Sequence, residues 1–335
     1  MVCVVVALTS IVPLPFWHPA AAKGFVLDWD GVLADTRLDF HKIRNKYFNG
    51  RLVPLLESSY LLEEKKREEL ERELLEVEME GAKRATPVAG AHELIDWLEE
   101  NHVPWAVVSR NCSASVQEAA LRCGIKLPKH VFTRDEKPIK PDPRVLWAAA
   151  ERLGVPYKEC VVVGDFLYDL QGARRAKMRA ILVERKGETW AHWADAEFES
   201  VKSLVEALRK PTPLVPWEYR KLVKQKGERW LRRAWQMTLS LPVEAPKVFD
   251  VAYEAAKLGV GCLVVKENAQ ISLEQWAYSR LLTLNWVEKP LLEGLNFFLK
   301  ERFPQLNIRY SDDAVTLPSD PEDMEPFLEE KILRC

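Results

Sequence analysis

The sequence predicts an α/β domain built on a parallel sheet, followed by a separate C-terminal α+β domain. Short apolar runs alternate with helical stretches up to residue 208, and this alternation is typical of parallel strands covered by helices on both faces. Beyond it stand Pro211, Pro213 and Pro216, which make a stiff linker. We therefore assign residues 23–210 to the first domain and residues 211–335 to the second.

Composition agrees with a folded two-domain protein. The chain has 335 residues, of which 47% are hydrophobic, and this is enough material for two cores. Lys and Arg number 48 against 50 Asp and Glu, so the whole chain exerts no general attraction on nucleic acid or anionic membranes. The six cysteines form no CxxC pair and have no histidine at a zinc-like interval. This excludes zinc fingers and predicts reduced thiols in a cytoplasmic protein.

Residues 1–22 are interpreted as an N-terminal extension. Met1–Val12 is apolar enough for the hydrophobic region of a signal peptide, but no basic residue precedes Lys23. A signal, a segment packed on a domain and a loosely ordered tail all fit this pattern. No apolar run reaches the roughly 20 residues that a membrane helix needs, so we expect no membrane partner.

The first domain contains five expected strands and several helices. The pattern from residue 37 to 83 predicts helix. Its second half, residues 63–80, is rich in Glu, Lys and Arg, and we interpret it as a solvated helix face. Further helices are expected around residues 93–98, 115–123, 145–153, 167–176 and 201–208. The strands are expected at residues 24–28, 105–108, 131–132, 160–163 and 180–183.

The second domain does not continue the regular alternation of strands and helices. One strand is expected at residues 262–265, and residues 307–310 and 314–317 resemble a hairpin. Ser272 and Gln275 form a capping box for a helix that runs through Leu281. Further helices are expected at residues 218–237, 246–258 and 290–302, before a tail that is acidic from Asp320.

The helix expected at residues 218–237 is basic and carries several aromatic side chains. Basic groups interleaved with aromatic rings suit single-stranded nucleic acid. The same pattern describes an amphipathic helix that buries its tryptophans and extends Arg and Lys outward. We prefer the second interpretation, because the acidic tail can cover the basic patch.

Polar residues follow the predicted strands of the first domain. Asp28 and Asp30 come after the first strand, Ser109 after the second, and Asp165 with Asp169 after the fourth. Lys140 lies in a loop, Lys-Pro-Asp-Pro. Carboxyl ends of neighbouring parallel strands share one edge of the sheet, so these side chains are expected to meet there. Crowded carboxylates favour Mg²⁺, and a lysine with a hydroxyl adds donors for a phosphoryl group.

At this point the chain resembles the haloacid dehalogenase (HAD) superfamily, in particular its phosphoglycolate-phosphatase-like branch. Four segments match that family's motifs in order: FVLDWDGVLADT, VVSRN, KPDP and VVVGDFLYD. The resemblance covers about residues 23–208. It implies a Rossmann-like core with a small helical cap inserted after the first strand, here at about residues 37–86.

The resemblance also implies roles for individual residues. Asp28 would be the nucleophile that forms an aspartyl-phosphate, and Asp30 the general acid and base. Ser109 would bind a phosphate oxygen, and Lys140 would neutralise the nucleophile. Arg110 and Asn111 are expected to contact the substrate. The Mg²⁺ ligands would be Asp28, the backbone carbonyl of Asp30, Asp165 and Asp169.

Three details bear on this resemblance. Dehalogenase members lack the second aspartate, so Asp30 favours phosphoryl chemistry. Lys137, also followed by proline, competes with Lys140 as the motif lysine, and we prefer Lys140 because its segment leads directly into a helix. Lys177 stands where relatives place a glycine, so it is expected to adopt a positive φ.

The resulting expectation is a Mg²⁺-dependent phosphomonoester hydrolase acting on a small phosphorylated metabolite. The alternatives are a nucleic-acid end phosphatase that docks through the basic helix, and a non-catalytic interaction protein on the same scaffold. The short cap leaves an open site, which suits a bulkier substrate. Five cap residues could meet an anionic substrate, although a solvated face is the simpler reading: Arg37, His41, Lys42, Arg44 and Lys46.

Overall fold

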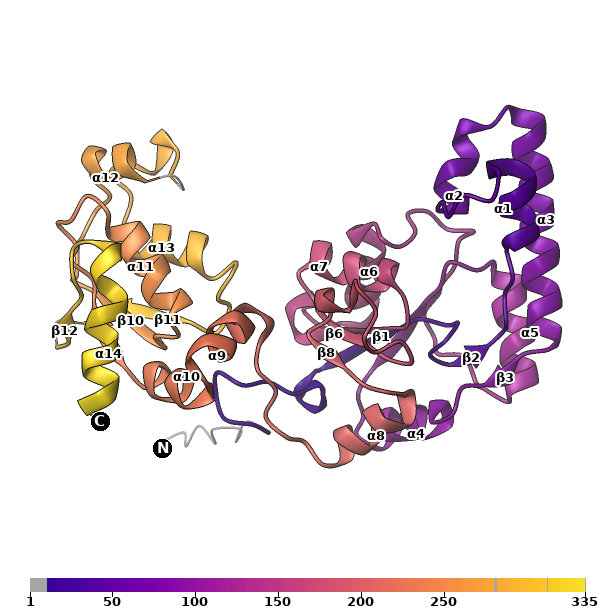
Figure 1. The fold of residues 1–335 in the computed structure, drawn as a ribbon, viewed down its shortest axis with the longest axis horizontal. Coiled ribbons are helices and arrows are strands. Elements are labelled where there is room, and N and C mark those ends of the chain that lie inside the picture. The colour runs from indigo at the N-terminus through magenta and orange to yellow at the C-terminus, as the bar shows by residue number, and fades with distance from the viewer. Residues whose placement is uncertain (1–10, 280–281, 312, 335) are drawn as a thin grey trace, which may run out of the picture. The chain divides into compact units, whose positions relative to one another are not determined.

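The computed structural model describes residues 11–279, 282–311 and 313–334, and it divides the chain into two compact units (Figure 1). One unit is His18–Thr212. The other joins the segment that ends at Trp17 to the chain from Pro213 onward. Most of the apolar stretch considered as a signal region, residues 1–10, lies outside the described residues.

Residues 11–17 pack on the C-terminal unit. Trp17 forms an antiparallel bridge with Leu214, with N–O distances of 3.1 and 2.9 Å. Val12 and Phe16 are buried in the core of that unit. The described part of the predicted extension is therefore shared between the units, because residues 18–22 belong with the first one.

The first unit contains a six-stranded parallel sheet, which confirms the predicted fold class. The strand order is β5-β4-β1-β6-β7-β8, with every neighbouring pair parallel. The first strand in the chain therefore lies inside the sheet, between β4 and β6. The strands are β1 (Gly24–Leu27), β4 (Trp105–Val108), β5 (Val131–Phe132), β6 (Cys160–Gly164), β7 (Arg179–Leu182) and β8 (Ala196–Glu197).

Helices cover both faces of this sheet. The apolar sides of α6 and α7 pack with β1, β4, β6 and β7 in one buried cluster. Figure 1 shows α4 and α8, which contact one another, across the sheet from that pair. The helices are α4 (Ala91–Glu100), α5 (Ser113–Cys123), α6 (Pro143–Leu153), α7 (Leu167–Ala176) and α8 (Val201–Arg209).

A helical cap follows β1 through a short antiparallel pair, β2 (Ala34–Asp35) and β3 (Thr86–Pro87). The helical pattern from residue 37 to 83 is divided among α1 (His41–Phe48), α2 (Leu55–Ser58) and α3 (Glu64–Lys83). Ile43, Leu55, Leu70 and Leu74 form a small core between these helices. The charged α3 also packs against α5 of the sheet domain, so it is not solvated on all sides.

The second unit also has a parallel sheet, in the order β11-β10-β9-β12. The expected hairpin of residues 307–310 and 314–317 is wrong, because these segments occupy opposite edges of the sheet. β11 pairs with β10, and β12 crosses the sheet to pair with β9. Helix α11 (Val248–Lys257) connects β9 to β10, and α12 (Leu273–Tyr278) and α13 (Leu291–Leu299) connect β10 to β11, whereas β11 and β12 are separated by four residues only. The first two connections have the α/β form that parallel pairing favours. The strands are β9 (Thr238–Ser240), β10 (Cys262–Val265), β11 (Asn307–Tyr310) and β12 (Val315–Thr316).

The helices of the second unit largely match the expected positions. The basic helix is broken at Gly227, whose φ of +82° separates α9 from α10. The capping box of Ser272 and Gln275 is confirmed at the start of α12, whereas Leu281 lies outside the described residues. The helices are α9 (Arg220–Lys226), α10 (Glu228–Trp235), α11 (Val248–Lys257), α12 (Leu273–Tyr278), α13 (Leu291–Leu299) and α14 (Met324–Arg334).

The acidic tail and the basic helices contact one another. Lys226 of α9 forms ion pairs with Glu325 and Glu329 of α14, the second at 2.5 Å. Trp230 is buried, and its Nε1 donates a hydrogen bond of 2.9 Å to the Leu258 carbonyl. A further bond of 2.8 Å joins Arg233 Nη1 to the carbonyl of Ile332. The basic segment is therefore built into the unit.

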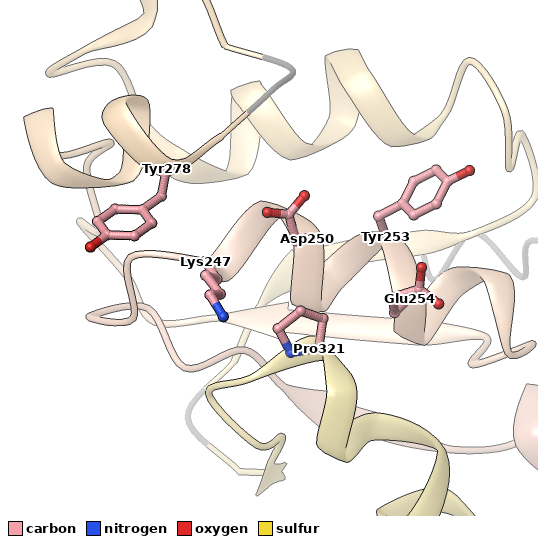
Figure 2. Close-up of a pocket in the computed structure, with 6 residues that line it drawn as sticks. All are labelled: Lys247, Asp250, Tyr253, Glu254, Tyr278 and Pro321. Atoms are coloured by element: carbon pink, nitrogen blue, oxygen red, sulfur yellow. The ribbon is translucent and has the colours of Figure 1, made fainter.

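An open hollow of about 380 Å³ lies beside the first turns of α11 (Figure 2). The Lys247 ammonium lies 2.7 Å from Asp320, and Glu254 pairs with Lys257 at 2.8 Å. These pairs neutralise part of the charge around the hollow. Its lining residues are Lys247, Asp250, Tyr253, Glu254, Tyr278 and Pro321.

In the part of the chain that the structure describes, no helix combines the length and apolar character needed to cross a membrane.

Candidate active site

Three neighbouring strands bring the predicted polar residues to one edge of the first sheet. β1 lies between β4 and β6, with Leu27 in register with Val107 and Val163. Asp28, Ser109 and Asp165 are the residues that directly follow these three strands. The backbones of Asp28 and Ser109 are still held by the sheet, since Asp28 N donates to Val163 O at 2.9 Å and Ser109 N to Phe132 O at 2.8 Å. The predicted convergence at the carboxyl edge is therefore present.

Lys140 lies at the centre of this group. Its Nζ is 2.6 Å from Asp28 Oδ1 and 2.6 Å from Asp169 Oδ1, and its side chain is 2% exposed. Burial opposes the charge of the lysine, but the two carboxylates outweigh burial and raise the pKa of Lys140. Lys137, in contrast, contacts Tyr60 of the cap at the surface. Of the two candidate lysines, only Lys140 contacts the carboxylates.

The carboxylates of Asp28, Asp165 and Asp169 have oxygens within 4.8 Å of one another. Burial and the charge of Asp169 raise the pKa of Asp165 to about 6, although Arg185, 2.9 Å away, acts in the opposite direction. Burial, followed by repulsion from Asp169, also holds the pKa of Asp28 well above its usual value. A crowded set of oxygen donors with elevated pKa values fits a hard divalent cation such as Mg²⁺.

Two glycines allow the carboxylates to approach so closely. Gly31 has a φ of +71°, and a Cβ there would lie 2.4 Å from the Asp165 carboxyl group. A Cβ at Gly164 would lie 2.2 Å from the Cβ of Asp169. Any larger residue at either position would push a carboxylate out of the cluster.

Asp30 lies beside the cluster in a different environment. Its carboxylate accepts hydrogen bonds from Thr36 Oγ1 and Asn111 Nδ2. Burial nevertheless dominates and raises the pKa of Asp30 to about 7. A carboxyl group with this pKa exchanges a proton near neutral pH, as a general acid and base requires.

The three residues after β4 have separate surroundings. The Ser109 side chain is buried, and its Oγ accepts a hydrogen bond of 3.0 Å from the backbone N–H of Asn111. The hydroxyl proton therefore remains available for a phosphate oxygen. Arg110 instead extends to the cap, where its two terminal nitrogens lie 2.8 and 2.7 Å from the carboxylate oxygens of Glu57. Its guanidinium also lies 4.3 Å from the centre of the Tyr168 ring.

Sequence reasoning missed several residues around the site. Glu78 belongs to the charged helix interpreted as solvated, yet it is buried and accepts from Cys112 N at 2.8 Å and from Arg134 at 3.0 Å. Glu78 follows the buried Leu70 and Leu74 at intervals of four residues, so the helical period could have placed it on the buried side of that helix. Thr36 belongs to the first motif and could likewise have been considered as a partner for Asp30.

The expectation for Lys177 agrees with the structure, and Cys112 has a structural role. Lys177 ends α7 with a φ of +59°, as expected from a position that relatives give to glycine. Cys112 caps α5, where its Sγ accepts from Ser115 N at 3.4 Å, and burial raises the pKa of the thiol. A protonated thiol is a poor nucleophile, and Cys112 acts as a helix cap.

Comparisons with known proteins find similarity over the first unit. Residues 22–177 match the family model of haloacid dehalogenase-like hydrolases. A crystal structure of a hydrolase from Pseudomonas syringae has a TM-score of 0.50 and 22% identity, and covers 57% of this chain and 99% of that one. At this identity the likeness shows the fold.

Curated relatives match shorter or more distant stretches. Phosphatase MT3486 of Mycobacterium tuberculosis is 50% identical over 50 residues, which are 15% of this chain and only 23% of that protein. N-acetylmuramic acid 6-phosphate phosphatase of Pseudomonas aeruginosa is 26% identical over 56% of this chain and 94% of its own length. An uncharacterised hydrolase of Saccharomyces cerevisiae, YOR131C, is 26% identical over 48% of this chain and 77% of its own. Residues 22–177 are therefore similar to the haloacid dehalogenase-like hydrolases.

Proposed function

We propose that this protein is a Mg²⁺-dependent phosphomonoester hydrolase that works through an aspartyl-phosphate. One observation carries the proposal: Lys140 Nζ lies 2.6 Å from Asp28 and from Asp169 at the carboxyl edge of the sheet. Two residues beyond Asp28 stands Asp30, a carboxyl group with a pKa of about 7. A fixed carboxylate beside a proton donor is the pair that phosphoester hydrolysis needs.

In the first step, Asp28 attacks phosphorus. Its Oδ1 is held by Lys140 at 2.6 Å and by the Trp29 N–H at 2.7 Å, so the carboxylate is fixed and the other oxygen forms the new bond. The bond from phosphorus to the leaving oxygen breaks, and the proton of Asp30 passes to that oxygen. Ser109 Oγ and Lys140 Nζ stabilise the charge that develops on the phosphoryl oxygens.

In the second step, water replaces the aspartyl oxygen. Asp30, now ionised, takes a proton from the water as it attacks phosphorus, and the bond to Asp28 breaks. Inorganic phosphate leaves, and both carboxyl groups return to their starting states. When bound, Mg²⁺ supplies positive charge that polarises the phosphoryl group. Its ligands would be Asp28, the backbone carbonyl of Asp30, Asp165 and Asp169.

The substrate we propose is a small phosphorylated metabolite, and the setting is the cytoplasm. The name of one relative, N-acetylmuramic acid 6-phosphate phosphatase, specifies a phosphomonoester of a small molecule. The cysteines that the structure describes as free thiols, which suit a reducing compartment, are Cys112, Cys123, Cys160 and Cys262.

The test is hydrolysis of p-nitrophenyl phosphate with and without Mg²⁺. We expect turnover by the wild-type protein, and a loss of at least about a thousandfold in Asp28→Asn, because an amide cannot attack phosphorus. Asp96→Asn, on the exposed side of α4, is the matched control and should keep full activity. A protein that hydrolyses no member of a phosphomonoester panel would instead be a non-catalytic member of the family.

A further inference from the structure

A cavity of about 250 Å³ lies next to the candidate active site, between the cap and α7. Most of its wall is apolar and comes from the cap. Two aromatic rings, Phe166 and Tyr168, close it from the start of α7. Its lining residues are Phe40, Arg44, Leu52, Val53, Pro54, Leu55, Leu56, Leu74, Glu78, Arg110, Asn111, Phe166 and Tyr168.

The cavity adjoins the reacting groups. Asn111 lines it and at the same time donates a hydrogen bond to the carboxylate of Asp30. Phe166 and Tyr168 both lie in the chain between Asp165 and Asp169 of the carboxylate cluster. A leaving group whose oxygen faces Asp30 would therefore extend into this cavity.

One polar group in the cavity wall has no partner. Arg44 Nε is buried without a hydrogen bond, while its guanidinium lies 5.9 Å from the centre of the Phe40 ring. Burying an unpaired donor is costly, so such a group calls for an acceptor. The other charges of the lining are paired, since Arg110 binds Glu57 and Glu78 binds Arg134. Within the described residues, Arg44 is the lining cation without an ion pair.

The size of the cavity limits the leaving group. A cavity of roughly 150 Å³ holds a benzene molecule, so 250 Å³ admits one ring with a substituent. A short polyol would leave the leucine, valine and aromatic walls in contact with water. The lining therefore matches a compact apolar group better than a polar one.

Resting on the phosphatase function proposed above, we propose that the substrate is a phosphomonoester of a compact, largely apolar alcohol that carries a carboxylate. The ring or branched hydrocarbon occupies the apolar wall of the cavity. The carboxylate accepts the hydrogen bond of Arg44 Nε and compensates the arginine charge. Arg44 thus determines specificity on the leaving-group side, at the opposite end of the substrate from Asp28.

The test compares three alkyl phosphates with leaving groups of similar basicity: benzyl phosphate, 4-carboxybenzyl phosphate and glycerol phosphate. We expect the highest kcat/KM for 4-carboxybenzyl phosphate. Because a hydrogen bond between charged groups is strong, Arg44→Met should lower this value roughly ten- to hundredfold and leave benzyl phosphate nearly unchanged. Lys42→Met, an exposed basic residue on the same helix, is the matched control and should preserve the ratio.

A second variant tests the apolar wall. Val53→Trp fills the cavity from a loop of the cap, so kcat/KM for both benzyl compounds should fall about tenfold while glycerol phosphate changes little. A preference for glycerol phosphate, or an Arg44→Met variant with an unchanged ratio, would overturn the proposal.

Failure of this proposal can be told apart from failure of the phosphatase function. If no phosphate ester is hydrolysed, calorimetric titration with 4-carboxybenzyl alcohol tests the cavity alone. Weaker binding to Arg44→Met than to the wild type would support the site without catalysis. Equal binding to both proteins, or none to the wild type, would reject it.

Discussion

Glu57 and Arg110 join the cap to the sheet domain through a bidentate ion pair, with N–O distances of 2.8 and 2.7 Å. Glu57 belongs to α2, and Arg110 directly follows Ser109 at the end of β4. Arg110 also donates a hydrogen bond to the carbonyl of Lys140. The Arg110 side chain therefore joins the end of β4 to the cap and to the segment that carries Lys140.

We expect Glu57→Gln to loosen the cap without unfolding the protein. Because the carboxylate is 42% exposed, solvent screens the pair, and the loss of stability should stay below about 1 kcal/mol. Hydrogen exchange of residues 41–62 should become faster, and KM should rise while Asp28 and Asp30 remain intact. Glu63→Gln, an exposed cap glutamate, is the control. Unchanged exchange in Glu57→Gln would show that the pair does not hold the cap.

Removing Lys140 should strongly destabilise the protein. Lys140→Met leaves Asp28 and Asp169 facing each other without a cation, and breaking a buried pair of this kind costs about 3–5 kcal/mol. The deficit should shrink as the pH falls, because the pKa of Asp28 is raised and its protonated form no longer repels Asp169. Urea unfolding at pH 5 and pH 8 measures both effects.

Lys137→Met is the control for that experiment, because Lys137 contacts Tyr60 at the surface. It should cost less than about 1 kcal/mol. A larger loss for Lys137→Met than for Lys140→Met would reverse the assignment of the motif lysine.

The pH dependence of hydrolysis should report the protonation of Asp30. Its pKa is about 7, and the protonated form donates to the leaving oxygen, so kcat/KM should fall as the pH rises above about 7. Thr36 donates a hydrogen bond that favours the ionised carboxylate. Thr36→Val should therefore raise the pKa of Asp30. The decrease of kcat/KM with rising pH should then begin at a higher pH. Thr189→Val, at an exposed position, is the control and should leave the pH profile of kcat/KM unchanged. An unchanged profile in Thr36→Val would show that the decrease above pH 7 comes from a group other than Asp30.

Much of the first unit could be predicted because its signals are local. Three neighbouring buried strands, β1, β4 and β6, are each followed by a polar residue, and parallel pairing brings those ends together without any knowledge of the loops. Arg44 shows where this reasoning stops. Its role depends on how the cap folds back over the sheet, and a basic residue on a helix carries the same sequence signal whether its Nε is buried or exposed.

The second unit was harder to predict for a related reason. Residues 307–310 and 314–317 are close in sequence, and short separation favours a hairpin. Their partners are β10 and β9, which lie elsewhere in the chain. The place of β12 at the far edge of the sheet depends on its pairing with β9, which is distant in sequence.

Magnesium should stabilise the protein through the carboxylate cluster. A ligand that binds only the folded state adds about 2.7 kcal/mol at a concentration one hundred times its Kd, which corresponds to roughly 5–10 °C in Tm for a domain of this size. Asp169→Asn should remove most of this increment, and Asp96→Asn should keep it. Thermal unfolding with Mg²⁺ and with EDTA gives the two values. An equal increment in Asp169→Asn would place the bound cation elsewhere.

The basic helices α9 and α10 should not provide a docking site for single-stranded nucleic acid. Stacking on a base needs an exposed ring, but Tyr219 and Trp230 are only 2% and 7% exposed, which leaves Trp217, at 41%, as the exposed ring before α9. Lys226 is paired with the acidic α14. Fluorescence anisotropy with a labelled oligonucleotide should show weak binding at 50 mM and at 200 mM salt. Glu325→Gln with Glu329→Gln releases Lys226, so this double variant should bind more tightly than the wild type at low salt. Tight binding by the wild type that weakens steeply with salt, with the same affinity in the double variant, would instead favour the nucleic-acid end phosphatase.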